Sequence, residues 1–418
     1  MLSEKRKKVG MRIINRVRIT TRLLHRRVPP FICAATTLIA MLLGGTPSPA
    51  FGAAPAPGIT ALGDLPGGTS NTRALRVSDD GLTVVGYSSS TLDIEAFRWT
   101  AGSGIVGLGT LGAAGSSANG ASADGSVVVG GSNTPSGSNA FRWTAATGML
   151  NLGNFPGSDP RISSAATAVS ADGSVVVGTG RAVSGFTLYS NAFRWTAASG
   201  LVALGDLPGG ALDSNAVDVS ADGSVIVGNG SGANASFATG EAFRWTAGSG
   251  MVSLGDLAGG AYVSQVHGVS ADGSTVVGEG TTASGHEAFR WTAATGMVGL
   301  GDLPGGVFES YAWDVSADGS TVVGTANGAS EAFRWTSARG MEPLWDVLVA
   351  AGIDPAADGW TQLTWATGVS ADGNTFIGVG ARNGNLEAFV ATIPEPGALG
   401  LISLALPALL RRRKPLRR

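Results

Sequence analysis

Short runs of β-branched residues alternate with glycine-containing turns over most of the chain, and the same pattern returns at regular intervals. One copy reads Val-Ser-Ala-Asp-Gly-Ser-Val-Ile-Val-Gly over 219–228 and continues with Glu-Ala-Phe-Arg-Trp-Thr over 241–246. Asp-Gly between two β-branched runs is a strong signal for a tight hairpin. Each unit therefore predicts four short strands: one ending in Val-Ser-Ala, one in Val-Val-Val-Gly, one in Ala-Phe-Arg-Trp-Thr and one in Met-Val-x-Leu-Gly-Asp-Leu.

The unit occurs seven times along the chain, at spacings of 44 to 56 residues. This period is that of a multi-strand blade rather than of one solenoid coil. Successive hairpins make an antiparallel meander, and seven of them predict an all-β, seven-bladed β-propeller of four-stranded antiparallel blades. A parallel β-helix is the alternative fold. The Asp-Gly turns that mark the copies begin at Asp80, Asp124, Asp172, Asp222, Asp272, Asp318 and Asp372.

The two ends of the repeat array complement each other. The seventh unit stops after its third strand at Ala391, whereas the chain begins with an orphan copy of the fourth-strand segment, Ile59 to Gly68. An N-terminal strand that completes the last blade would close the ring and remove open sheet edges. A β-helix would not explain this complementarity. One unit is irregular, because helical spacing of apolar residues predicts a helical insert at about 341–358 in place of the usual fourth strand.

The aromatic residues of the repeat predict its core. Phe and Trp of Phe-Arg-Trp lie two residues apart and share one face of the strand, so we expect them to pack between blades, with Arg on the other face. Partly buried arginines need partners, and each is expected to pair with a carboxylate or carbonyl of the repeat. These arginines are Arg98, Arg142, Arg194, Arg244, Arg290 and Arg334.

The repeated block resembles the bacterial extracellular repeat family named for a His-Ala-Phe motif. The matching residues are Ala-Phe-x-Trp, as in Ala288-Phe289-Arg290-Trp291, followed by Gly-Met-Val-x-Leu-Gly-Asp-Leu, and Val-Ser-Ala-Asp-Gly. The resemblance implies an extracellular location and no particular chemistry. In place of the family's His, the seven copies carry Glu95, Asn139, Asn191, Glu241, Glu287, Glu331 and Glu387.

Both ends of the chain have the pattern of targeting signals. Residues 1–53 combine a basic region, an apolar run and small residues, which predicts a signal peptide cleaved by signal peptidase on export, and leaves the repeat domain at 54–393. The apolar run of about 13 residues is shorter than a membrane span needs. The final segment, 394–418, has an apolar run at 397–410 followed by a basic cluster, which predicts a transmembrane segment whose charged end stays cytoplasmic.

This tripartite tail resembles the PEP-CTERM sorting signal of Gram-negative bacteria. The residues that carry the resemblance are Pro394, Glu395, Pro396, Arg411, Arg412 and Arg413. The resemblance implies an exosortase-type processing enzyme as partner. It further implies transient anchoring in the inner membrane, then placement at the cell surface or in the extracellular matrix.

The composition of the repeat domain limits the partners and the kinds of site that can be expected. Residues 51–393 carry 12 basic and 28 acidic residues, a net charge of −16. No basic stripe is left to follow a phosphate backbone, so nucleic acid is not an expected partner. The only cysteine, Cys33, lies in the leader. We find no motif for a catalytic, metal or cofactor site, and a single Asp in each Asp-Gly turn is a good turn residue rather than a calcium loop.

Loop length is the remaining signal for a ligand site. The connection between the second and third strands varies from 7 to 13 residues, while the Asp-Gly turn is fixed. Variable loops on a rigid scaffold usually carry binding. Phe186, Tyr189 and Phe237 are therefore the candidate rim residues, and the expected function is a structural or adhesive module that binds extracellular polysaccharide or surface proteins. The alternative is a secreted propeller hydrolase or lyase acting on polysaccharide, which would need a cluster of His, Tyr and two acids at the central channel.

Overall fold

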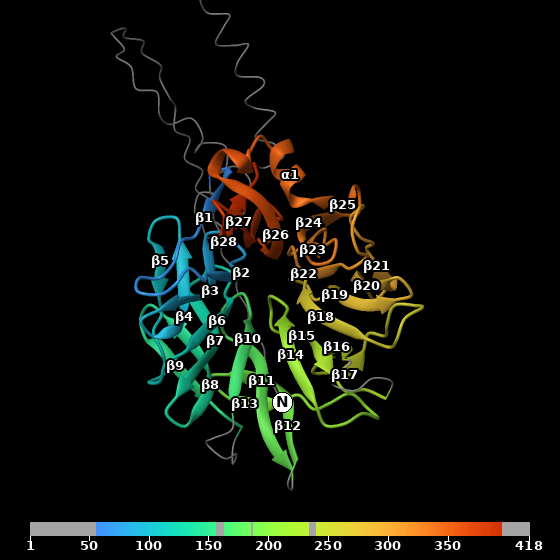
Figure 1. Ribbon diagram of the computed structural model, residues 1–418. Coiled ribbons are helices and arrows are strands. Elements are labelled where there is room, and N and C mark those ends of the chain that lie inside the picture. The colour runs from blue at the N-terminus through green and yellow to red at the C-terminus, as the bar shows by residue number, and fades with distance from the viewer. Residues whose placement is uncertain (1–55, 156–162, 185–186, 234–239, 395–418) are drawn as a thin grey trace, which may run out of the picture. The chain divides into compact units, whose positions relative to one another are not determined.

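The computed structural model describes residues 56–155, 163–184, 187–233 and 240–394 (Figure 1). The predicted signal peptide, 1–53, lies outside these residues, as does the sorting tail beyond Pro394, including the predicted transmembrane segment at 397–410. Within the described part of the chain, no helix has the length and apolar character needed to cross a membrane.

The predicted seven-bladed β-propeller is confirmed: seven separate sheets each contain four antiparallel strands (Figure 1). Blades 1 to 6 follow one another along the chain, and blade 7 joins β26, β27 and β28 to β1. The innermost strands are β2 (Arg73–Val77), β6 (Ser116–Ala121), β10 (Ser164–Val169), β14 (Ser214–Val219), β18 (Ser264–Val269), β22 (Tyr311–Val315) and β26 (Trp360–Val369). The second strands are β3 (Thr83–Ser90), β7 (Val127–Thr134), β11 (Val176–Ser184), β15 (Val225–Gly230), β19 (Thr275–Thr282), β23 (Thr321–Ala326) and β27 (Thr375–Arg382).

The outer half of each blade carries the Phe-Arg-Trp strand and a short edge strand. The third strands are β4 (Asp93–Thr100), β8 (Gly137–Thr144), β12 (Thr187–Thr196), β16 (Glu241–Thr246), β20 (Gly285–Thr292), β24 (Glu331–Thr336) and β28 (Asn385–Thr392). The outermost strands are β5 (Gly104–Gly107), β9 (Gly148–Gly153), β13 (Gly200–Ala203), β17 (Gly250–Ser253), β21 (Gly296–Gly299), β25 (Gly340–Pro343) and β1 (Gly58–Ala61).

The N-terminal strand closes the ring as the sequence predicts. β1 pairs antiparallel with β28, from Gly58 opposite Thr392 to Ala61 opposite Phe389. The Leu62 N–H extends the pairing by donating to the Ala388 carbonyl at 3.0 Å. Every strand of the propeller therefore lies within 54–393, so this fragment carries the whole closed ring.

The Asp-Gly turns form a second closed ring, around the central channel. A backbone N–H of each turn donates to a carbonyl of the next turn, and the seventh bond runs from Ala371 back to Asp79, with all seven distances between 2.9 and 3.2 Å. Within a turn the Asp carboxylate is held locally. In blade 4, Asp222 accepts from the Ser220 hydroxyl at 2.7 Å and from the Ser224 N–H at 2.9 Å. These bonds lower the pKa of Asp222 and give the repeated Asp a structural role.

Every innermost strand carries a β-bulge at the same place. In blade 4 the register with β15 shifts between Ala216 and Asp218, and the other six blades shift at the equivalent pair. A bulge re-aims side chains next to it. Consequently two consecutive residues at the bulge line the channel or its mouth in two blades, Leu75 and Arg76 in blade 1 and Trp313 and Asp314 in blade 6.

The repeated Phe lies in the predicted core between blades. Phe243 is fully buried and belongs to a cluster that includes Val177 and Ala192 of blade 3 together with Ile226 of blade 4. Trp245 is half-buried at the edge of this cluster. The core requires a glycine on the second strand, because a Cβ at Gly228 would lie 2.0 Å from the Asn215 carbonyl oxygen and 2.7 Å from the Phe243 ring.

Five of the six arginines of Phe-Arg-Trp find the carbonyl or carboxylate partners that the sequence predicts, whereas Arg194 makes no hydrogen bond or ion pair with the described residues. The Nε of Arg98 donates to the Gly125 carbonyl at 3.0 Å, which ties blade 1 to the Asp-Gly turn of blade 2. Arg142, Arg244 and Arg290 make the same bond to the next blade. Arg334 instead pairs with the Glu342 carboxylate at 3.0 Å.

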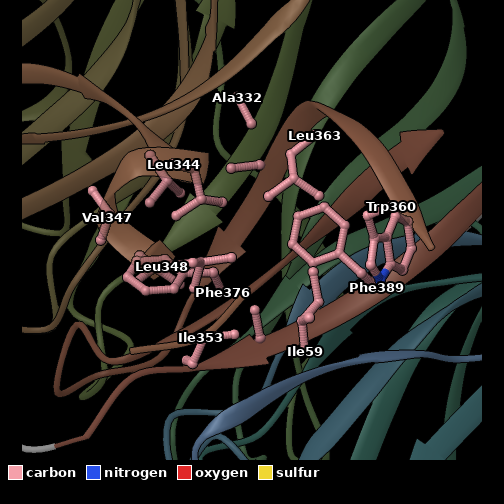
Figure 2. Packing of buried hydrophobic residues seen from close by; sticks show 14 residues of the cluster. Ile59, Ala332, Leu344, Val347, Leu348, Ile353, Trp360, Leu363, Phe376 and Phe389 are labelled. Carbon is pink, nitrogen blue, oxygen red and sulfur yellow. The ribbon is translucent and has the colours of Figure 1, made fainter. Parts of the chain in front are cut away.

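The helical insert of blade 6 differs from the prediction in one respect. The fourth strand is not replaced: β25 pairs with β24 in the usual register, with Trp335 opposite Met341. The turn before it ends at Gly340 with φ of 71°, as in the other blades, so the hairpin forms independently of the insert. Helix α1 (Leu344–Ala350) and the 3-10 turn η1 (Pro355–Asp358) come after the strand. Figure 2 shows Leu344 and Leu348 of α1 close to Phe376 of blade 7.

Gly228→Ala is expected to destabilise the protein by about 3 kcal/mol, because the added methyl group overpacks the contact between the first and second strands. Gly248→Ala is the control, since nothing lies within 4 Å of a Cβ at that position. Urea unfolding of the 54–393 fragment measures both. Equal stabilities for the two variants would contradict the packing argument.

Candidate functional site

The central channel is narrow inside and opens on one face. Around the Asp-Gly ring it encloses about 80 Å³, lined mostly by small residues such as Ala171, Ala221 and Ala271. At the opposite end a cavity of about 470 Å³ is lined by Leu75, Arg76, His267, Trp313, Trp365 and Thr367. We call this cavity the channel mouth. It lies on the rim that carries the connections between second and third strands, because the Trp365 indole N–H donates to the Ala329 carbonyl in one of them at 3.1 Å.

A buried ion cluster forms the floor of the mouth. The Arg76 Nη1 lies 2.9 Å from Asp314 Oδ1, and Nη2 lies 3.5 Å from Asp218 Oδ1, so one guanidinium of blade 1 bridges blades 6 and 4. Each carboxylate also accepts a backbone N–H of the following blade: Val269 donates to Asp218 at 3.1 Å and Val369 donates to Asp314 at 3.0 Å.

The cluster contains more negative than positive charge, and pKa values shift accordingly. The pKa of Asp218 is raised to about 6. Burial is the main cause, Arg76 acts against it, and the nearby charge of Asp314 adds to the rise. Burial and Asp314 raise the pKa of Asp79. For Arg76, burial lowers the pKa, but the two aspartates outweigh burial and the net pKa is raised. The guanidinium therefore stays charged and holds the floor together.

Aromatic rings form the wall of the mouth. The rings of His267 and Trp313 lie 4.5 Å apart between centroids, and Trp313 stacks on Tyr311 at 5.8 Å. Tyr311 stacks in turn on His286 at 5.7 Å. On the other side, the Arg73 guanidinium lies 5.3 Å from the Trp365 ring centroid. These rings, contributed by blades 5, 6 and 7, offer flat apolar surface that leads from the channel toward the rim.

Two acid pairs accompany the rings. The Nε2 of His267 donates to the Glu279 carboxylate, and the Tyr311 hydroxyl donates to Glu309 at 2.5 Å. In the neutral form of the His267 ring, the bond to Glu279 leaves Nδ1 as the acceptor nitrogen. Burial raises the pKa of Tyr311, and the hydrogen bond to Glu309 adds to this. Among the described residues, no group of three or more His, Cys, Asp or Glu could hold a metal ion.

Of the three predicted rim residues, the structure describes only Tyr189. Phe186 and Phe237 are outside the described residues. Tyr189 lies in β12 opposite Ala182, because the long connection of blade 3 extends the hairpin of β11 and β12 rather than forming an open loop. Tyr189 does not line the channel or its mouth. Its role in binding stays a prediction.

Sequence reasoning missed the mouth residues, although the repeat carries a signal for them. Two consecutive positions near the end of the first strand form a different pair in nearly every copy, for example Leu75-Arg76, Val217-Asp218 and Trp313-Asp314. A strict alternation of side chains would place only one of each pair on the channel side. In blades 1 and 6 both members of the pair line the channel or its mouth.

Comparisons with solved structures give the fold. The chain is similar to an oligogalacturonate lyase from Vibrio parahaemolyticus at 11% identity and a TM-score of 0.53, over 81% of this chain and 94% of that one. An oligogalacturonate lyase in complex with manganese matches at 13% identity and a TM-score of 0.50, over 77% and 89%. TolB from Acinetobacter baumannii matches at 14% and 0.43, and the chain spans only 63% of its length. No family model and no curated protein matches the sequence.

Asp218→Asn is expected to gain stability relative to wild type as pH rises from 4 to 7. The folded pKa of Asp218, about 6, exceeds the ordinary 3.8, so the stability it contributes is fully present below about pH 4 and is lost as pH rises through 6. The difference between these two pKa values corresponds to about 3 kcal/mol of stability that the wild type loses between pH 4 and 7. An amide does not ionise, so the variant does not lose it. Urea unfolding of both proteins at several pH values measures it.

Asp222→Asn is the matched control of opposite sign. Hydrogen bonds to the ionised carboxylate lower the pKa of Asp222, so its contribution is present at neutral pH and is lost as pH falls. A stability difference for Asp218→Asn that stays constant with pH would contradict the assignment of a raised pKa to Asp218.

Proposed function

We propose that this protein is an exported propeller that binds extracellular polysaccharide at its channel mouth and acts as a structural or adhesive module of the cell surface or matrix. The single observation that carries the binding site is the aromatic wall of the mouth, where Trp313 and Trp365 line a cavity of about 470 Å³ and Tyr311 stacks on Trp313. A volume of this size lies within the range of small-molecule sites. Flat rings suit the apolar faces of sugar rings, and the flanking charged and hydroxyl groups suit their hydroxyls.

The channel itself cannot be the sugar site. Its interior of about 80 Å³ holds no more than a few water molecules. A sugar chain would therefore lie across the mouth, with Arg76 as the floor and the wall rings at its side. The export signal and the PEP-CTERM-like tail support an extracellular setting for this binding, and imply signal peptidase and an exosortase-type enzyme as processing partners.

Trp365→Ala is expected to weaken binding of a bound glycan about five- to thirtyfold, because loss of one stacking ring removes about 1–2 kcal/mol. A screen of the 54–393 fragment against bacterial exopolysaccharides by calorimetry first identifies the glycan. Trp245→Ala, at the edge of the cluster between blades 3 and 4 and outside both the mouth and any other cavity named in this article, is the control for loss of an indole. Undiminished binding by Trp365→Ala would place the glycan elsewhere.

A specific observation favours a second candidate, a hydrolase or lyase acting on polysaccharide. At and beside the mouth lies the combination that such an enzyme needs: a histidine and a tyrosine, each bound to an acid, in the pairs His267 with Glu279 and Tyr311 with Glu309. Glu279 orients the His267 ring, and in the neutral ring Nδ1 is then suited to general base catalysis. The protonated Tyr311 hydroxyl is suited to donate a proton.

Glu279→Gln is expected to abolish any chain cleavage while leaving binding of the same glycan nearly unchanged, because it removes the carboxylate that fixes His267. Product analysis on the samples of the binding screen tests this, with galacturonate oligomers included because two structural neighbours are named oligogalacturonate lyase. Glu309→Gln tests the Tyr311 pair separately. Wild-type binding with no product on any polymer excludes the enzyme among the polymers tested.

A further inference from the structure

A second cavity, of about 440 Å³, lies between blades 6 and 7 beside the insert. Its polar lining residues are Asn327, Ser330, Glu331, Thr361 and Gln362, and the Trp345 indole of α1 forms a wall. We call it the insert pocket. It adjoins the channel mouth, because Gln362 and Trp365 of β26 hold the same connection of blade 6, through the carbonyls of Ser330 and Ala329.

The insert changes the surroundings of one repeated glutamate. In blade 5, Glu287 lies over Gly299, where a Cβ would be 2.1 Å from its carboxylate, and it accepts the Gly301 N–H at 3.0 Å. Blade 1 repeats this arrangement with Glu95 and Gly109. These bonds give the glutamate a structural partner in both blades.

Blade 6 lacks both glycines. Pro343 stands opposite Phe333 where Gly299 stands opposite Phe289, so the space that Glu287 occupies in blade 5 is filled by a proline ring. Trp345 stands where Gly301 would. Glu331 therefore makes no bond of this kind, and among the described residues its only hydrogen bond is from Asn327 Nδ2, at 3.2 Å. One carboxylate oxygen is left for a ligand.

The donors of the pocket are already committed to the protein. The Gln362 amide donates to the Ser330 carbonyl at 2.7 Å, and the Ser330 hydroxyl donates to the Asn327 carbonyl at 2.7 Å. The Thr361 hydroxyl donates to the Ala381 carbonyl at 3.3 Å. What remains is mainly acceptors: a partly buried carboxylate next to an indole face, with no Lys or Arg in the lining.

We propose that the insert pocket binds the protonated amine of an amino sugar, with Glu331 accepting the ammonium group and Trp345 packing on the sugar ring. An ammonium offers three donors, pairs with a carboxylate and is attracted to an indole face. The net charge of −16 on residues 51–393 attracts a cationic polymer at long range. The amine class rests on the pocket alone, whereas its place on a sugar chain that continues across the mouth rests on the proposed function.

The test is calorimetric titration of the 54–393 fragment with a fully deacetylated glucosamine tetramer and with its N-acetylated counterpart. The deacetylated tetramer is expected to bind at least about tenfold more tightly, because acetylation removes the charge that Glu331 recognises. Glu331→Gln is expected to reduce the affinity for the deacetylated tetramer about tenfold and to leave the acetylated one unchanged. Glu287→Gln is the matched control, since it removes the same charge from the blade without a pocket.

The outcomes separate the inference from the proposed function. Equal affinity for the two tetramers in the wild type overturns the inference without relying on any variant. Loss of binding in Trp365→Ala, together with no effect of Glu331→Gln, leaves the proposed function and overturns the amine site. Glucosamine monomer binding that depends on Glu331, without polymer binding, supports the amine site and counts against the proposed function. A lysine-containing peptide that binds more tightly than the tetramer, again through Glu331, overturns the amino sugar as the ligand.

Discussion

The antiparallel pairing of β1 with β28 is the contact on which the architecture depends. Four residue pairs join the start of the repeat array to its end, and without them blade 7 would expose the backbone of β28 as an open edge. Closure also fixes the distance between blades 7 and 1. At this distance the Asp79 carbonyl accepts the last hydrogen bond of the Asp-Gly ring, and the Thr367 hydroxyl donates to the Ala74 carbonyl at 2.8 Å. The channel, its mouth and the bridge from Arg76 to Asp314 all need this seventh interface.

Repetition made most of this fold predictable. Seven copies of the same turn and six of the same Phe-Arg-Trp strand make the prediction independent of any single segment, and the missing and surplus fourth strands identify the closing pair. The register shift in the first strand could not be predicted in this way, since a bulge depends on how two backbones fit around a buried ring. Gly228 shows this fit: its missing side chain admits both the Asn215 carbonyl and the Phe243 ring.

The candidate site was hidden for the same reason. Three innermost strands have sequences typical of ordinary core strands. Only the bulge in each strand turns His267, Trp313 and Arg76 toward the channel. Length variation predicts a site on the same rim as the channel mouth but on blades 3 and 4, where the longer connection of blade 3 extends a hairpin. The aromatic wall instead lies on blades whose connections are of ordinary length. Residue type at the two bulge positions is a better guide here than loop length.

A ring of seven alike blades presents seven alike surfaces, so binding one ligand in one orientation requires that the symmetry be broken. In this chain the breaks fall where they disturb the core least: at the bulge positions, which face the channel, and after β25, where the strand register is already complete. Replacing two glycines by Pro343 and Trp345 leaves Phe333 fully buried and Leu344 in the core, yet it separates Glu331 from its structural partner. The same glutamate accepts a backbone N–H in blade 5 and only the Asn327 side chain in blade 6, because its surroundings and not its identity determine its chemistry.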